Sequence, residues 1–216
     1  MCRVLQCIFL SLAFAAFAAA ADQTTRARAE ARVSASSPEW TDLVRRYAEK
    51  PDGVADFEER RYFPFRREPV VLKGQVRVSR VHGLSLHYTA PEERTLILDE
   101  TGMLVREPKG QKSPPLDPRA TAANEVMRHI LRLDFAALEK SFEISGVRGP
   151  DEWSLTLVPR ADTMRRALGD IHVGGDAISV RQIDLRKSAK QHVDITMSPA
   201  REVGAFTADE VKRYFR

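Results

Sequence analysis

Cysteine is nearly absent from this chain of 216 residues, and its two copies, Cys2 and Cys7, lie close to the N-terminus. Both fall within residues 1–21, where Arg3 precedes an apolar run that ends in four alanines. A positive charge, an apolar run and small residues in this order are typical of a secretory signal peptide, so we expect cleavage at the end of this segment. The mature chain would have no thiol, and its stability would come from core packing without disulfides. A retained N-terminal anchor is the alternative interpretation.

A large excess of one charge is also lacking. The chain has 34 Lys and Arg against 30 Asp and Glu, and Arg3 is the only charged residue in 1–21, so 33 basic and 30 acidic side chains would remain after cleavage. The basic residues are spread along the chain, and aromatic residues make up only 7% of it. A nucleic-acid-binding surface needs a concentrated basic patch, so no nucleic-acid partner is predicted. A weak attraction to anionic lipid headgroups is compatible with the charge.

The motifs of common enzymes and metal sites are missing. The five histidines are scattered without a His-Glu-x-x-His pair, and the expected mature chain has no thiol to complete a metal site. No Gly-x-Ser-x-Gly elbow, phosphate-binding loop or dinucleotide-binding fingerprint is present. The sequence therefore predicts no metal, no cofactor and no catalytic residue. An enzyme that acts on a lipid headgroup or a glycan stays open as an alternative, because catalytic residues can converge from distant positions.

The rest of the chain divides into a leader and one folded region. Residues 22–36 are rich in Ala, Arg, Ser and Thr without periodicity, which indicates a flexible leader. A single domain is predicted over residues 37–216. It opens with Ser37 and Pro38, which favour the start of a helix, and apolar residues follow at helical spacing. These are Trp40, Leu43, Val44 and Tyr47.

Further helices are predicted later in the chain. Apolar residues within 122–131 recur at helical spacing, Asp134 favours a short helix after it, and Thr207 begins a terminal helix. The segment 161–168 is charged, and its helical character is left open. The segment 108–118 holds four prolines and is expected to be a loop.

About ten strands are predicted in hairpin order. They are short runs of alternating apolar residues between turn signals such as Gly174-Gly175-Asp176. Pro64 interrupts the strand 57–65 and so indicates an edge strand or a bulge. Strands in hairpin order with few helices predict an α+β fold, in which a large antiparallel sheet carries its helices on one face. Such a sheet must curl.

The clearest hairpin, residues 74–88, has an apolar face with one polar exception. Side chains two residues apart on a strand share a face. This face carries Val76, Val78, Leu84, Leu86 and Tyr88. Arg80 lies on the same face, and its guanidinium can reach water along its own methylene stem at the strand end. Alternatively, the face lines a cavity for an apolar ligand, closed by helices, and Arg80 donates hydrogen bonds to backbone carbonyls.

Several short motifs follow one another in a recognisable order. They are Phe57-x-Glu59, Gly74-x-Val76-x-Val78-x-Arg80, Leu84-x-Leu86-His87-Tyr88-x-x-Pro91, Leu96-Ile97-Leu98-Asp99 and Trp153-x-Leu155-x-Leu157-x-Pro159. Together they resemble the LolA-type periplasmic carriers that ferry outer-membrane lipoproteins in Gram-negative bacteria. The likeness covers residues 38–206.

The resemblance implies a strongly curved, unclosed half-barrel whose concave apolar face is lidded by helices and receives acyl chains. The lining residues would be Phe57, Val76, Val78, Leu84, Leu86 and Tyr88. Arg80 would tie the lid to the barrel in the empty state. The implied protein is a periplasmic monomer that is not an enzyme. Its partners would be a lipidated cargo, an inner-membrane lipoprotein-releasing or exporter complex and an outer-membrane acceptor.

The chain also departs from the family pattern. Val81 follows the arginine where the family usually has proline, Leu86 stands in place of an aromatic residue, and Glu59 in place of glutamine. Residues 103–106 read Met-Leu-Val-Arg where the family favours tryptophan and tyrosine. A more aliphatic interior can suit a different lipid. Two related functions therefore stay open: a periplasmic sensor that binds a lipid and reports it, and a carrier of a non-lipoprotein lipid that works with an inner-membrane exporter.

Overall fold

The computed structural model describes residues 30–113 and 118–216 of the chain. The expected signal peptide lies outside the described residues. Strand β1 (Ala31–Arg32) pairs with a later strand, and Val33 behind it is buried, so the folded body begins at Ala31. The prediction of a flexible leader over 22–36 is therefore wrong for its last residues, because an apolar side chain there has a place in the core.

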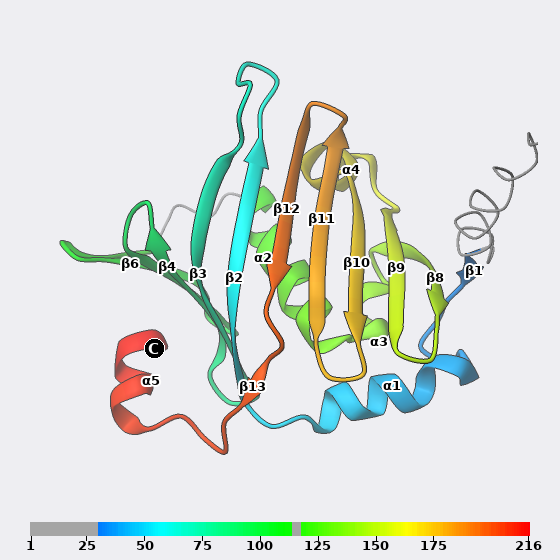
Figure 1. Ribbon diagram of the computed structural model, residues 1–216, viewed down its shortest axis with the longest axis horizontal. Coiled ribbons are helices and arrows are strands. Elements are labelled where there is room, and N and C mark those ends of the chain that lie inside the picture. Colours follow the sequence, from blue (N-terminus) through cyan, green and yellow to red (C-terminus); the bar gives the residue numbers. More distant parts are fainter. Residues whose placement is uncertain (1–29, 114–117) are drawn as a thin grey trace, which may run out of the picture. The chain divides into compact units, whose positions relative to one another are not determined.

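One antiparallel sheet of 13 strands dominates the fold. After β1, the strands are β2 (Gly53–Tyr62), β3 (Val70–Ser79), β4 (Gly83–Ala90), β5 (Arg94–Asp99), β6 (Gly102–Glu107), β7 (Gly110–Lys112), β8 (Phe142–Arg148), β9 (Glu152–Pro159), β10 (Asp170–Asp176), β11 (Val180–Ser188), β12 (Gln191–Met197) and β13 (Arg201–Glu202). The sheet is curved and unclosed, as predicted (Figure 1). The number exceeds the predicted ten because β1, β7 and β13 are only two or three residues long.

The sheet consists of two series of hairpins joined in the middle. The strand order is β1-β8-β9-β10-β11-β12-β2-β3-β4-β5-β6-β7, and β13 also pairs with β2. Strand β2 pairs with β12 on one side and β3 on the other, so it is central. The expected edge strand or bulge at Pro64 is therefore wrong: β2 ends at Tyr62, and Pro64 lies in the turn that follows.

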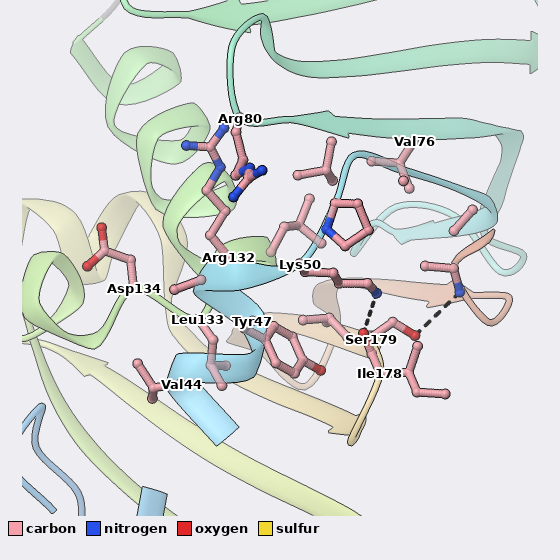
Figure 2. Close-up of a pocket in the computed structure, with 18 of the residues that line it drawn as sticks. Val44, Tyr47, Lys50, Val76, Arg80, Arg132, Leu133, Asp134, Ile178 and Ser179 are labelled. Carbon is pink, nitrogen blue, oxygen red and sulfur yellow. Dashed lines mark hydrogen bonds between the residues drawn. The ribbon is translucent and has the colours of Figure 1, made fainter. Parts of the chain in front are cut away.

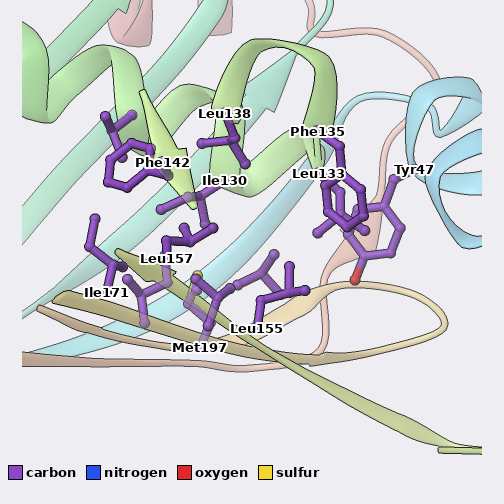
Figure 3. Close-up of a cluster of buried hydrophobic side chains, with 14 of the residues drawn as sticks. Tyr47, Ile130, Leu133, Phe135, Leu138, Phe142, Leu155, Leu157, Ile171 and Met197 are labelled. Carbon is purple, nitrogen blue, oxygen red and sulfur yellow. The ribbon is translucent and has the colours of Figure 1, made fainter. Parts of the chain in front are cut away.

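Four helices belong to the main core or its border. They are α1 (Pro38–Glu49), α2 (Pro118–Arg132), α3 (Phe135–Leu138) and α4 (Asp162–Leu168). Figure 3 shows Ile130 of α2 and Leu138 of α3 on the side of the helices, with Leu157 and Ile171 of the strands below them, in one buried cluster. The predicted cap of α3 is confirmed, because the Asp134 side chain accepts a hydrogen bond from the backbone N–H of Ala137. None of the helices in the described part has the length and hydropathy of a membrane span.

The last helix, α5 (Ala208–Tyr214), lies on the opposite face of the sheet. It begins with the predicted cap at Thr207, which forms a reciprocal pair of hydrogen bonds with Glu210. Tyr214 stacks under the buried guanidinium of Arg77, 3.5 Å from the ring centre. The expectation that the sheet carries its helices on one face only is thus incomplete, because this terminal helix covers the other face of the β3–β4 hairpin.

The predicted turn at Gly174-Gly175-Asp176 is misplaced by a few residues. Both glycines lie within strand β10, and the chain turns after Asp176, whose carboxylate accepts hydrogen bonds from the N–H groups of Ile178 and Ser179. A Cβ atom on Gly175 would lie 2.4 Å from the indole of Trp153. The glycine is therefore required for close packing of this aromatic ring, and not for the turn.

Candidate functional site

Two cavities lie between the helices and the concave face of the sheet. The first has a volume of about 440 Å³ and the second about 370 Å³. Val76, Leu131 and Met197 line both, so these three side chains form the wall between them. Most of the remaining lining is aliphatic or aromatic, which makes both spaces suited to apolar groups.

The first cavity lies between α1, the α2–α3 junction and one end of the sheet (Figure 2). Strand β3 contributes Val78, and helix α1 contributes Val44 and Tyr47. The helical spacing of the α1 residues puts them on one side of that helix, facing the strands. Figure 2 shows Val44 and Tyr47 from α1 on the same side of the space as Leu133.

The β3–β4 hairpin has the predicted register, with Val76 opposite Leu86 and Val78 opposite Leu84. The predicted lining residues are divided between the two cavities. The first contains Val76, Val78 and Arg80, and the second contains Phe57, Val76, Leu86 and Tyr88. Leu84 lines neither of these two cavities, because it is packed into the core with 1% of its surface exposed. Their role in ligand binding stays a prediction.

Three cationic side chains line the first cavity: Lys50, Arg80 and Arg132. Burial lowers the pKa of Arg132, and the nearby Arg128 adds to this effect; burial also lowers the pKa of Lys50. Lys50 donates a hydrogen bond to the carbonyl of Ile178. Among the described residues, none of the three takes part in a salt bridge.

The donor of the hydrogen bond between helix and sheet is an arginine of the helix, and not Arg80 of the hairpin. Arg132, the last residue of α2, donates through Nη2 to the carbonyl of Ser79, the last residue of β3. Arg80 lies beside it (Figure 2), and within the described part of the chain its guanidinium forms no hydrogen bond. Asp52 accepts hydrogen bonds from the Ser79 hydroxyl (2.7 Å) and the Arg80 N–H (3.0 Å), so the chain already turns at Arg80. Strand alternation therefore ends at Ser79, and Arg80 lines the first cavity from an exposed turn position.

The second cavity holds a buried carboxylate. Glu59 alternates with Phe57 and Arg61 along β2, so all three face the cavity, and Glu59 is only 5% exposed. The Tyr88 hydroxyl donates to Glu59 Oε2 (2.8 Å), and Arg61 Nε donates to Oε1. Burial raises the pKa of Tyr88, and the Glu59 charge adds to this effect. The pair of donors satisfies a charge that would otherwise be costly to bury.

Sequence reasoning did not predict Lys50, Arg61, Arg132 or Met197 as cavity residues. Lys50 and Arg132 each follow the apolar positions of a helix, where a cation is ordinarily solvated, so the local pattern contains no signal for them. Arg61 shares its strand face with Phe57, and this alternation could have identified it.

Comparison with known proteins assigns the family. The model of the family described as outer membrane lipoprotein carrier protein LolA-like matches residues 31–212. No curated protein sequence matches significantly.

The solved structures that match this chain are distant from it in sequence. A LolA superfamily protein from Nitrosomonas europaea is 8% identical, with 79% of this chain and 96% of that chain covered and a TM-score of 0.39. A putative outer membrane lipoprotein-sorting protein domain from Vibrio parahaemolyticus is 10% identical, with 81% and 95% covered and a TM-score of 0.42. The MucA/MucB complex of Pseudomonas aeruginosa gives 10% identity and a TM-score of 0.47, with 80% of this chain but only 59% of that chain covered. Because the family model spans nearly all of the described chain, the protein belongs to the LolA-like family of outer membrane lipoprotein carrier proteins.

Proposed function

We propose that this protein is a periplasmic, non-enzymatic carrier. Its two cavities hold the acyl chains of a lipoprotein or a related lipidated molecule, which it receives at the inner membrane from a lipoprotein-releasing or exporter complex and delivers to an acceptor at the outer membrane. It acts as a monomer after removal of residues 1–21.

The observation that supports this proposal most is the apolar lining of both cavities beneath the helices. Each buried methylene contributes about 0.8 kcal/mol. Contacts of this kind are non-directional, so an aliphatic lining can hold an acyl chain firmly while discriminating little between cargoes. This property suits a carrier of many different lipoproteins.

A ligand is transferred only when the acceptor binds it better than the carrier does, and an open state of the helices would give the ligand a path out. The Arg132–Ser79 hydrogen bond joins the end of α2 to the end of β3. We infer that this bond, instead of one from Arg80, holds the helices on the sheet in the empty protein. Entry of an acyl chain would break it.

Isolation of the native protein from a periplasmic extract, followed by lipid mass spectrometry, tests the function directly. A bound lipoprotein supports the proposal, and turnover of an added lipid contradicts it.

Binding of a fluorescent acyl probe to Val78→Trp gives a second test, because the indole would fill part of the first cavity. Val71→Trp is the matched control, since Val71 lies on the same strand with its side chain on the other face, partly exposed. Equal loss of binding in both variants would argue against the cavity.

A second candidate is a carrier or sensor of an anionic lipid. The observation that favours it is the set of three cations along the first cavity, Lys50, Arg80 and Arg132. Acyl esters and amides carry no charge, whereas guanidinium groups bind phosphate and carboxylate well. Recovery of one small phospholipid or fatty acid species, without lipoprotein, would support this candidate over the first.

A further inference from the structure

The connection between β2 and β3 carries an exposed aromatic pair. Figure 1 shows this connection extending past the body of the sheet. Phe65 at its tip is 82% exposed, and its ring stacks on that of Phe63 with 5.4 Å between the ring centres. The turn is fixed by a hydrogen bond from the Arg66 N–H to the Phe63 carbonyl (3.1 Å). The aromatic tip is therefore held in place on a defined turn while remaining open to solvent.

Basic side chains surround this tip. Arg66 and Arg67 follow Phe65 directly and are exposed. The β11–β12 connection lies at the same end of the sheet in Figure 1; it adds the exposed Lys190, and the end of β11 adds the exposed Lys187.

Helix α4 extends the basic surface. Arg165 and Arg166 line a shallow depression together with Lys187. Arg165 forms a salt bridge with Asp162 (3.5 Å). For the other cations of this end, no salt bridge occurs within the described residues; they are Arg66, Arg67, Arg166, Lys187 and Lys190. Glu68 is the one carboxylate in the 63–69 connection.

The second cavity reaches this same end. Phe63 lines it from the β2–β3 connection, Lys187 from the end of β11 and Gln191 from the start of β12. An acyl chain that leaves the cavity between these residues would emerge beside the aromatic tip.

We propose that this end of the protein is a docking surface for an anionic lipid bilayer. Phe65 inserts at the level of the headgroups, and the surrounding cations contact anionic phosphates. An exposed aromatic side chain among lysines and arginines has the composition of interfacial membrane anchors. The proposal does not depend on the carrier function, because docking requires no ligand in the cavities.

Flotation of the purified mature protein with vesicles provides the test. Vesicles of phosphatidylcholine and phosphatidylglycerol in equal parts should bind the protein, while pure phosphatidylcholine or high salt should abolish binding. Phe65→Ser should weaken binding about tenfold. Arg66→Gln with Arg67→Gln should weaken it about 25-fold, since each charge contributes about fivefold.

Matched controls lie elsewhere on the body. Val81 is 84% exposed in the β3–β4 connection, at the other end of β3, so Val81→Ser removes an equally exposed apolar group. Lys109→Gln with Lys212→Gln removes two exposed charges from the β6–β7 turn and from α5. Both controls should bind vesicles as the unchanged protein does. Absence of vesicle binding, or an equal loss in the controls, would overturn the proposal.

Insertion itself can be measured with Phe65→Trp and vesicles whose acyl chains carry bromine. The introduced indole should be quenched, whereas the native Trp40 and Trp153 are buried in the core and should not be. Vesicle binding without quenching would refute the insertion of this residue. Binding of the acyl probe without vesicles should be unchanged in Phe65→Ser, so a failure of docking and a failure of the carrier function give different results.

Discussion

Replacement of Arg132 by methionine tests whether the contact between α2 and β3 holds the empty cavity closed. Methionine keeps the length of the side chain but has no donor for the Ser79 carbonyl. A hydrogen bond from a charged donor contributes about 1.5–3 kcal/mol. The lower value applies here, because the site is partly solvated and Arg80 and Arg128 repel the guanidinium. A loss of about 1.5 kcal/mol from the closed state corresponds to about a tenfold shift toward the open state.

The assay is equilibrium binding and release of an uncharged fluorescent acyl probe. If opening limits entry, Arg132→Met should bind the probe up to about tenfold more tightly and release it more slowly to acceptor vesicles. The probe affinity of Arg132→Lys should lie between those of the unchanged protein and Arg132→Met, because an ammonium keeps the charge but loses the planar geometry of the guanidinium. Arg80→Met is the control, since it removes an adjacent guanidinium that makes no hydrogen bond with a described residue. An equal gain in both methionine variants, or no gain in a variant with an unchanged melting temperature, would refute the reasoning.

Three further predictions concern stability. Tyr88→Phe removes a hydrogen-bond donor to the buried Glu59 of the second cavity and should lower the unfolding free energy, measured by urea denaturation, by about 1–3 kcal/mol. An unchanged denaturation midpoint would contradict this prediction. Gly175→Ala should lower the unfolding free energy by about 1–3 kcal/mol because the methyl group crowds Trp153, whereas Gly204→Ala, whose Cβ has nothing within 4 Å, should leave it nearly unchanged. An equally small effect of both substitutions would show that the strand tolerates the methyl group. Burial, aided by Arg77, lowers the pKa of His87, so the unfolded chain takes up its proton first as the pH falls below about 6.5 and stability declines. His87→Gln should show a smaller difference in denaturation midpoint between about pH 7.5 and pH 5.5; an identical pH dependence would place the titrating group elsewhere.

The local sequence pattern was sufficient to predict the β3–β4 hairpin, because the alternation of apolar residues fixes both the register of the strands and which side chains face inward. The same reasoning placed Val76 and Val78 on the concave face, where they lie. It could not show that α5 covers the other face of this hairpin. Arg77 reads as a solvated residue on an outward face, and only the tertiary position of Tyr214 explains its burial.

The polar groups of the cavities were harder to predict. Arg80 breaks an apolar alternation, so pattern can identify it, but the alternation ends with Ser79 and pattern alone does not give the contacts of its guanidinium. Arg132 breaks no pattern, since a cation at the end of a helix interacts favourably with the helix dipole wherever it points. Its contact with Ser79 joins residues 53 positions apart, and such a contact is invisible without the fold.

The place of β2 in the middle of the sheet determines when the sheet can be completed. β2 pairs with β12, so that Phe57 lies opposite Met197, and this junction cannot form until almost the entire chain is available. The hairpin series on either side contain mainly local contacts and can form early, whereas the junction requires closure of a long loop. Folding should therefore end with a slow step that joins two preformed halves, and deletion of β12 should leave the edge of β2 from Phe57 to Tyr62 unpaired.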